Sequence, residues 1–337
     1  MKTALSNSQI VSAIGLPQEI VTALQTAQGD TFSAAANQFI SALVNKIVYQ
    51  KVENMKFDNP FKKYDGYPIT YGDTIENIFV DKAMGEKFNK DNTDPFAKVG
   101  PAVKSLYASI NYEMQYPVTI EDKLLRRCAL NEYGFMNLIN AILQSLVTGR
   151  SVDEYLATII MLNNSEIYAN GFEELDITSA STDSAKMRLV TDKIVDVYTD
   201  FNLPSIDNNK SRVLQVTSPE NCLLIIKQTL LNKINLDFLV GAFNLSKVEL
   251  VKKIIPVRSF MAVVNTINGG TLTPGTTGDD IDFVILDERG FDNHVALQDG
   301  GSIYNPRGKY TNHFDNLWKI ISFRYDFQAR AFKLKTE

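Results

Sequence analysis

Three acids in the stretch PITYGDTIENIFVD have the side chains and the proximity to do chemistry: Asp73, Glu76 and Asp81. Carboxylates bind divalent cations and serve as general acids or bases. Successive strand residues point to opposite faces, so on a strand Glu76 would point away from Asp73 and Asp81. If Asp73-Thr74-Ile75-Glu76 capped a helix instead, backbone N–H groups would occupy the acids. Both geometries favour structural or intersubunit contacts over a catalytic or metal site.

Other groups with reactive side chains lack the neighbours that chemistry requires. The chain has no Gly-x-Ser-x-Gly elbow, phosphate loop, dinucleotide fingerprint or His-Glu-x-x-His motif. His294 and His313 stand in polar, turn-rich surroundings, and Cys128 and Cys222 lack partners at metal-ligand spacing. The acidic run at residues 279–282 is typical of a solvated loop. We therefore expect no catalytic residues, no cofactor and no metal site.

Composition describes an ordinary globular protein and excludes several classes of partner. The 337 residues are 45% hydrophobic and 22% charged, which is enough for two lobes with their own cores. No apolar run is long enough to span a bilayer, and MKTALSNSQI lacks the apolar core of a signal peptide. The net charge of −5 argues against a basic groove for nucleic acid. These features predict a protein without a membrane partner, made in a cytoplasm.

The first third of the chain is predicted to hold a helical arm and then a long hairpin. Short helices are expected over residues 1–60. From Lys104 onward, apolar and polar residues alternate cleanly to Val118, which predicts one long half-buried strand. With PITYGDTIENIFVD as the first strand and a polar tip between the two, residues 64–118 form a hairpin. The candidates for its apolar face are Ile110, Tyr112, Met114 and Tyr116.

Capping signals and apolar runs predict the elements that follow. Capping boxes at Thr119-Ile120-Glu121-Asp122 and Ser151-Val152-Asp153-Glu154 predict two helix starts, and Asp183 is expected to cap another helix. Ser218-Pro219-Glu220 predicts a helix to about residue 234. Strands are expected at residues 212–217, IIPVRSF, IDFVILDE and LWKIISFRYDF, and NGGTLTPGTTG reads as a flexible loop.

Several of these segments together resemble one protein family. GDTIENIFVD, DPFAKVGPAVKSLYASINYEMQYPVTI, LLRRCALNEYGFMNLINAILQSL and SVDEYLATI are similar to the major capsid proteins of small short-tailed phages of the picovirus type. SPENCLLIIKQTLLNKINLDFLVGAFNLSKVELVKKIIPVRSF and YNPRGKYTNHFDNLWKIISFRYDFQARAF continue the resemblance in family order. The resemblance implies an α+β fold of the Hong Kong 97 type.

The resemblance also implies a division of the chain. An N-terminal helical arm would occupy residues 1–63 and the extended hairpin loop residues 64–118. The peripheral lobe with its spine helix would follow over residues 119–182, and the axial lobe over residues 183–282. Return strands in residues 283–337 would complete both lobes.

The implied function is structural: a major capsid protein that self-assembles into a phage head around packaged double-stranded DNA. The expected partners are other copies in pentamers and hexamers, a portal, a scaffolding protein and DNA bound without sequence specificity. Subunit contacts are expected at Asp73, Glu76, Phe79, Asp81, Ile110, Tyr112, Met114, Tyr116, Arg126 and Arg127. Two alternatives stay open: the shell protein of an encapsulin-type nanocompartment, and an enzyme that uses the acidic loop clusters.

Overall fold

The computed structural model describes residues 56–69, 71–83, 85, 87, 100, 102–121, 132–234, 253–260 and 281–335, with side chains from Asn140 onward in the first long helix. Two compact units divide the chain. One includes Val118–Leu146 and Ser302–His313, and the other Lys56–Pro117, Val147–Gly301 and Phe314–Glu337. The expected arm before residue 56, the hairpin tip, Cys128 and NGGTLTPGTTG lie outside the described residues. So does the pair Arg126 and Arg127.

The described chain is a mixed α+β structure, as predicted, with three sheets. A five-stranded sheet has the order β4-β10-β7-β5-β6 and a three-stranded sheet the order β3-β9-β8, while β1 and β2 pair only with each other. The strands are β1 Thr74–Val80, β2 Val103–Ser109, β3 Tyr112–Glu121, β4 Phe172–Asp176, β5 Cys222–Lys227, β6 Ile254–Val257, β7 Phe283–Asp287, β8 His294–Asn305, β9 Tyr310–Ile320 and β10 Ala329–Lys335.

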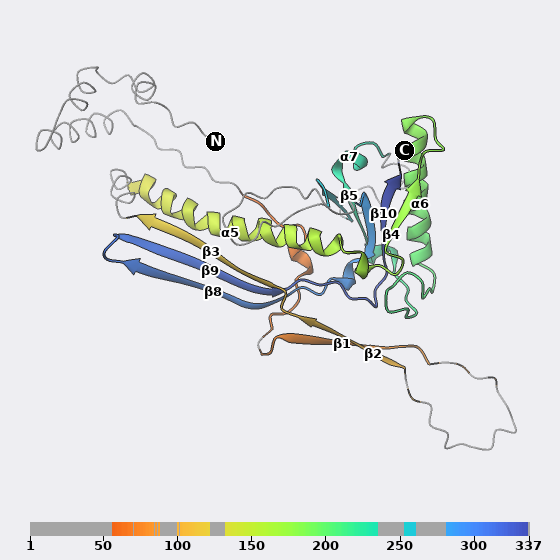
Figure 1. Cartoon of the computed structure of the whole chain (residues 1–337), viewed down its shortest axis with the longest axis horizontal. Helices are drawn as coiled ribbons and strands as arrows, with labels where there is room; N and C mark the ends of the chain where they lie inside the picture. Colours follow the sequence, from red (N-terminus) through yellow and green to blue (C-terminus); the bar gives the residue numbers. More distant parts are fainter. Residues whose placement is uncertain are drawn as a thin grey trace, which may run out of the picture. The chain divides into compact units, whose positions relative to one another are not determined.

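Three α-helices and four short 3-10 helices complete the described elements. The α-helices are α5 Glu132–Leu162, α6 Asp183–Phe201 and α7 Gln228–Leu231, and the 3-10 helices are η1 Lys62–Tyr64, η2 Ser165–Ile167, η3 Pro219–Asn221 and η4 Glu288–Gly290. Figure 1 shows α5 as a single unbroken helix. None of the described helices is long and apolar enough to cross a membrane.

The five-stranded sheet is buried on both faces, and its central strands divide their side chains between two cores. In β5, Leu224 and Ile226 enter a core that includes Val190 and Ile194 of α6. Leu223 and Ile225 point to the other core, which includes the end of α5. A strand covered on both faces needs apolar side chains at every position. The run CLLIIK therefore forms a central strand.

Several sequence predictions around this sheet were right and others were wrong. Residues 212–217, predicted as a strand, form only an isolated bridge between Gln215 and Ser205. Strands β6 and β7 confirm IIPVRSF and IDFVILDE. The helix predicted at Asp183 is present as α6, but its cap is Thr182 and not Asp183, because the Thr182 hydroxyl accepts from the Ala185 N–H at 3.3 Å and Asp183 is the first helical residue. The predicted helix after Pro219 is wrong, because only η3 precedes β5 there. The five consecutive apolar residues Cys222 to Ile226 have no periodicity that separates a buried strand from a helix.

The long strand predicted over residues 104–118 is in fact two strands in different sheets. β2 pairs with β1, whereas β3 belongs with β9 and β8. Between them, the Asn111 side chain receives the Ile321 N–H at 2.9 Å and donates to the Ile321 carbonyl at 2.8 Å. This pair of bonds imitates a strand pairing and fixes the place where the chain changes sheets. The hairpin proper therefore ends at Ser109.

Both capping-box predictions in this region are also wrong. Thr119 to Glu121 lie at the end of β3, and Ser151 to Glu154 lie inside α5. A serine followed by an acid caps a helix only where the preceding backbone is not helical. Residues before Ser151 already form helical turns, so the box has no free N–H groups to satisfy.

Candidate functional site

The ribbon of β1 and β2 presents an apolar face to solvent. Its antiparallel register places Glu76 opposite Tyr107, Ile78 opposite Ser105 and Val80 opposite Val103. Four large side chains on this face are exposed: Ile78 57%, Val80 58%, Val103 52% and Tyr107 67%. A two-stranded ribbon alone is only marginally stable in water. This face therefore has the composition of a surface that another surface covers.

The three acids of this stretch do not converge. Tyr107 donates its hydroxyl to Glu76 Oε1 at 2.8 Å, and this hydrogen bond raises the pKa of Tyr107. Asp81 accepts from the N–H of Lys82 at 2.8 Å, and the Asp73 carbonyl accepts from the Ile110 N–H at 3.1 Å. Among the described residues, no three His, Cys, Asp or Glu side chains are grouped to hold a metal. Contact with a neighbouring chain stays a prediction for Asp73, Glu76 and Asp81, and for the half-buried Phe79.

The residues predicted to form the apolar face of the hairpin lie elsewhere. Ile110 is in the junction after β2, and the other three lie on β3. Tyr112 is 8% exposed and packs with Leu317 and Ile321 of its own chain, and Met114 packs against the same cluster. Their placement on the hairpin face is wrong, because β3 pairs with β9 and not with β1. Contact of Ile110, Tyr112, Met114 and Tyr116 with a neighbouring chain stays a prediction.

Tyr112 and Tyr116 form a hydrogen-bonded array with α5. Their hydroxyl oxygens lie 2.7 Å apart, and the Asp153 carboxylate of α5 is close enough to Tyr116 that each affects the pKa of the other. Burial raises the pKa of both tyrosines and of Asp153, where the bond from Tyr116 opposes the shift. The array is therefore a structural polar contact between helix and sheet.

The foot of the hairpin is bonded to the chain that leads into β8. Asn77 donates its amide to Asp292 Oδ2 at 2.6 Å, and His294 Nε2 lies 3.0 Å from Asp292 Oδ1. Main-chain bonds run from Gly66 N to Asn293 O and from Ile69 N to Val295 O, at 2.7 and 2.8 Å. These contacts attach residues 66–77 to one short segment of the body.

A buried ion network lies next to this attachment. The Lys319 ammonium, with 3% of its side chain exposed, contacts both oxygens of Asp65 at 2.7 and 2.8 Å and Glu154 Oε2 at 2.9 Å. Arg150 lies 3.7 Å from Glu154 and 3.0 Å from Asp315. Burial raises the pKa of Asp65, and the Lys319 ammonium opposes that shift in part. The network joins β9, α5 and the hairpin foot.

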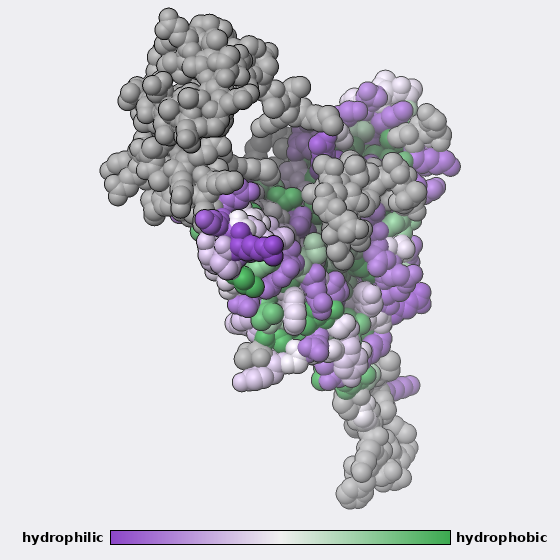
Figure 2. Space-filling model, turned by 60° about the vertical axis from the view of Figure 1, so that its left-hand side comes forward, coloured by the Kyte–Doolittle hydropathy of each residue, from purple (hydrophilic) through white to green (hydrophobic). Residues whose placement is uncertain are grey.

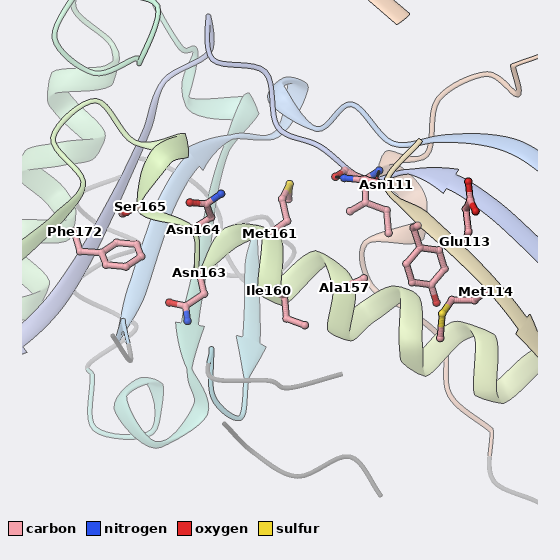
Figure 3. A pocket seen from close by; sticks show the side chains of 12 residues that line it. Asn111, Glu113, Met114, Ala157, Ile160, Met161, Asn163, Asn164, Ser165 and Phe172 are labelled. Atoms are coloured by element: carbon pink, nitrogen blue, oxygen red, sulfur yellow. Dashed lines mark hydrogen bonds between the residues drawn. The ribbon is translucent and has the colours of Figure 1, made fainter. Parts of the chain in front are cut away.

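An open groove of about 720 Å³ lies where the start of β3 meets the end of α5. Figure 3 shows Met114 on one side, Ala157, Ile160 and Met161 along the helix, and Phe172 beyond the helix end. Hydrophobic residues also reach the surface between hydrophilic ones on the face drawn in Figure 2. The residues that line the groove do not include an arrangement of nucleophile, base and acid, so its chemistry is that of apolar contact.

Sequence reasoning missed the residues that hold the hairpin in place. Asn77, Asp292 and His294 are distant in sequence and carry no local motif. Lys319 gives a weak signal, because it is a single charge inside the apolar run LWKII and a buried lysine needs an acidic partner. The identity of that partner depends on tertiary structure.

Comparison with known proteins shows the family directly. A model of the Phi29-like phage major capsid protein family matches residues 15–333. The chain is 24% identical to the major capsid protein of Bacillus phage PZA, over 96% of this chain and 75% of that protein. It is 25% identical to that of Bacillus phage B103, over 88% of this chain, but it spans only 63% of the B103 protein.

Solved phage capsids share the fold at low sequence identity. The capsid structure of Staphylococcus phage Andhra matches 86% of this chain and 88% of its own, with a TM-score of 0.67 and 11% identity. The capsid of the cyanophage P-SCSP1u covers 86% and 92%, with a TM-score of 0.56 and 10% identity. With a family match over most of its length and major capsid proteins among its relatives, the chain belongs to the Phi29-like phage major capsid protein family and is a structural, shell-forming protein.

Proposed function

We propose that this protein assembles through its hairpin into a closed phage head of pentamers and hexamers around packaged double-stranded DNA. The observation that carries the proposal is the exposed apolar face of the β1–β2 ribbon. Burial of apolar surface contributes about 25 cal/mol per Å², and a repeated lattice multiplies such modest contacts. The ribbon would act as a clasp laid on the next copy.

The chemistry of the clasp is that of a heterologous contact. The ribbon face of one copy meets a different surface of the next, and such head-to-tail contacts close into rings when the rotation allows. The Glu76–Tyr107 bond holds two polar groups beside Ile78, so the face combines an apolar centre with a polar edge. That combination resembles the anatomy of protein interfaces.

The finer architecture belongs to the same proposal. In a fold of the Hong Kong 97 type, α5 would be the spine helix of the peripheral lobe, and the five-stranded sheet with α6 would lie in the axial lobe. We propose a portal and a scaffolding protein as further partners, assembly in the host cytoplasm, and a non-enzymatic role. The negative net charge supports a container that does not bind DNA tightly.

Electron microscopy of the purified, overexpressed chain tests the proposal. Closed shells are expected from the full chain, alone or with a scaffolding protein. Deletion of residues 86–97 at the hairpin tip should lower the yield or stability of shells, and charge reversal at Arg126 and Arg127 tests a second contact. A chain that stays a small monomer under all these conditions contradicts assembly. If the tip deletion leaves the yield and stability of shells unchanged, the hairpin is not the clasp, although assembly itself is still supported.

A further inference from the structure

His294 occupies a position in which both ring nitrogens face hydrogen-bond acceptors. Nδ1 lies 2.7 Å from the Tyr67 carbonyl oxygen, and Nε2 lies 3.0 Å from Asp292 Oδ1. A main-chain carbonyl only accepts, and an ionised carboxylate only accepts. A neutral imidazole has one N–H, so it can satisfy one of these partners. Only the imidazolium donates to both.

The surroundings of the ring are built to hold it in this orientation. A Cβ at residue 66 would collide with Cε1 of His294, so only glycine allows the foot segment to lie against the ring. Asp292 is 6% exposed and its other oxygen accepts from the Asn77 amide at 2.6 Å. The carboxylate is thus shared between the histidine and the first strand of the hairpin.

The charges on neighbouring elements leave Asp292 as the acid that faces the ring. On the foot segment, Asp65 contacts Lys319 of β9. From β1 the neutral amide of Asn77 reaches Asp292, and Ser322 donates to the Asp292 main-chain carbonyl at 3.1 Å. A proton on His294 therefore has two effects. It balances the charge of the buried Asp292 carboxylate, and it allows the ring to donate a hydrogen bond to the Tyr67 carbonyl of the hairpin foot.

We infer that His294 is a proton-dependent latch between the foot of the hairpin and the body of the same chain. With its extra proton, the ring bridges Tyr67 and Asp292, and Asp292 in turn holds Asn77. When the proton leaves, one ring nitrogen becomes an acceptor and faces another acceptor, either the Tyr67 carbonyl or Asp292. The foot segment then loses one of the hydrogen bonds that hold it to the body. Histidine is the side chain that ordinarily gains or loses a proton at physiological pH, and the two acceptors around His294 make the hydrogen bonds of the foot depend on that proton.

Hydrogen exchange on the full chain as single subunits tests the latch, independently of whether shells form. Protection of the amides in residues 66–80, corrected for the intrinsic effect of pH, should fall about tenfold as the pH rises from about 5.5 to about 7.5, since a charge-assisted bond is lost. His294→Gln should show low protection at both pH values. The chain has two histidines, so His313→Gln is the matched control and should behave as the unaltered protein.

Two outcomes of the exchange experiment overturn the inference: flat protection in the unaltered chain, or an undiminished pH dependence in His294→Gln. A second measurement needs no variant at His294. In nitrogen NMR of the imidazole rings, with His313→Gln used for assignment, the His294 signals should pass from imidazolium to neutral ring over the range in which protection falls. A single neutral tautomer throughout that range also overturns it.

Discussion

The side-chain amide of Asn77 lies 2.6 Å from Oδ2 of Asp292 and donates to it, across 215 positions of sequence. This bond joins the first strand of the hairpin to the residues that lead into β8. The acceptor is a buried carboxylate, so the bond is charge-assisted and stronger than one between neutral groups. The attachment of the ribbon to the body therefore depends in good part on this side-chain pair.

Asn77→Ala should loosen the ribbon without unfolding the protein. Hydrogen bonds to charged groups contribute about 1.5–3 kcal/mol, so exchange of the amides in β1 should speed up by about tenfold or more. Thr74→Ala, at an exposed position of the same strand, is the control. Equal exchange in the two variants would show that the Asn77 amide does not hold the ribbon.

Lys319→Met should be strongly destabilising. It leaves the half-buried Asp65 and the buried Glu154 without their shared cation, and removal of one partner from a buried ion pair costs about 3–5 kcal/mol. Urea unfolding measures the loss, with Lys82→Met as an exposed control. Adding Asp65→Asn and Glu154→Gln to Lys319→Met should restore part of the stability. A triple variant weaker than the single one would contradict this account.

Asp153 should make the protein more stable as the pH falls. Burial raises its pKa in the folded state, so between the unfolded and folded values the folded protein binds more protons and stability decreases as pH rises. The difference in unfolding free energy between the unaltered protein and Asp153→Asn should therefore increase as the pH falls from neutral toward the range where carboxyls titrate. A difference that is constant with pH would refute the assignment.

Gly290→Ala should destabilise the packing around η4. A Cβ there would collide with the ring of Phe323, which is 3% exposed and cannot move into solvent. Overpacking of this kind costs about 1–3 kcal/mol in thermal or denaturant unfolding. Gly301→Ala is the matched control, because no described atom lies within 4 Å of the position that its methyl group would take. Equal stability of the two variants would mean that Phe323 relaxes freely.

Ile78→Ser combined with Val80→Ser should leave the subunit folded and reduce assembly. Both side chains are exposed in the single chain, so unfolding should change little, whereas an interface centred on them would lose its apolar contact. Sedimentation and electron microscopy measure assembly. Leu203→Ser provides a control of equal exposure, 58%, outside the hairpin. Shells at normal yield from the double variant would remove this face from the subunit contact.

Local pattern was sufficient to predict some elements and insufficient for others. A capping signal near Asp183 was sufficient to predict α6, and its buried residues Val190, Ile194 and Val197 recur at the spacing of a helix packed on one side. CLLIIK was misassigned because burial on both faces removes the alternation that identifies a strand. The alternation through Ile110 and Asn111 was real, but periodicity does not reveal that a strand changes partner.

The hairpin was predictable as an element, whereas its attachment was not. Alternating residues and a polar tip indicated two strands and a turn. The bonds among Asn77, Asp292 and His294, and the ion network at Lys319, join segments far apart in sequence. Only tertiary structure determines which of many possible polar partners lie together.

Asn111 lies at the junction where the chain leaves the hairpin and enters the three-stranded sheet. β2 continues into β3 through this residue, and its side chain bonds both main-chain groups of Ile321. Both bonds run from one side chain to one residue, so a displacement of this part of the chain has to break them together. Asn111 therefore adds two hydrogen bonds at the point where a displacement of the hairpin would reach β3.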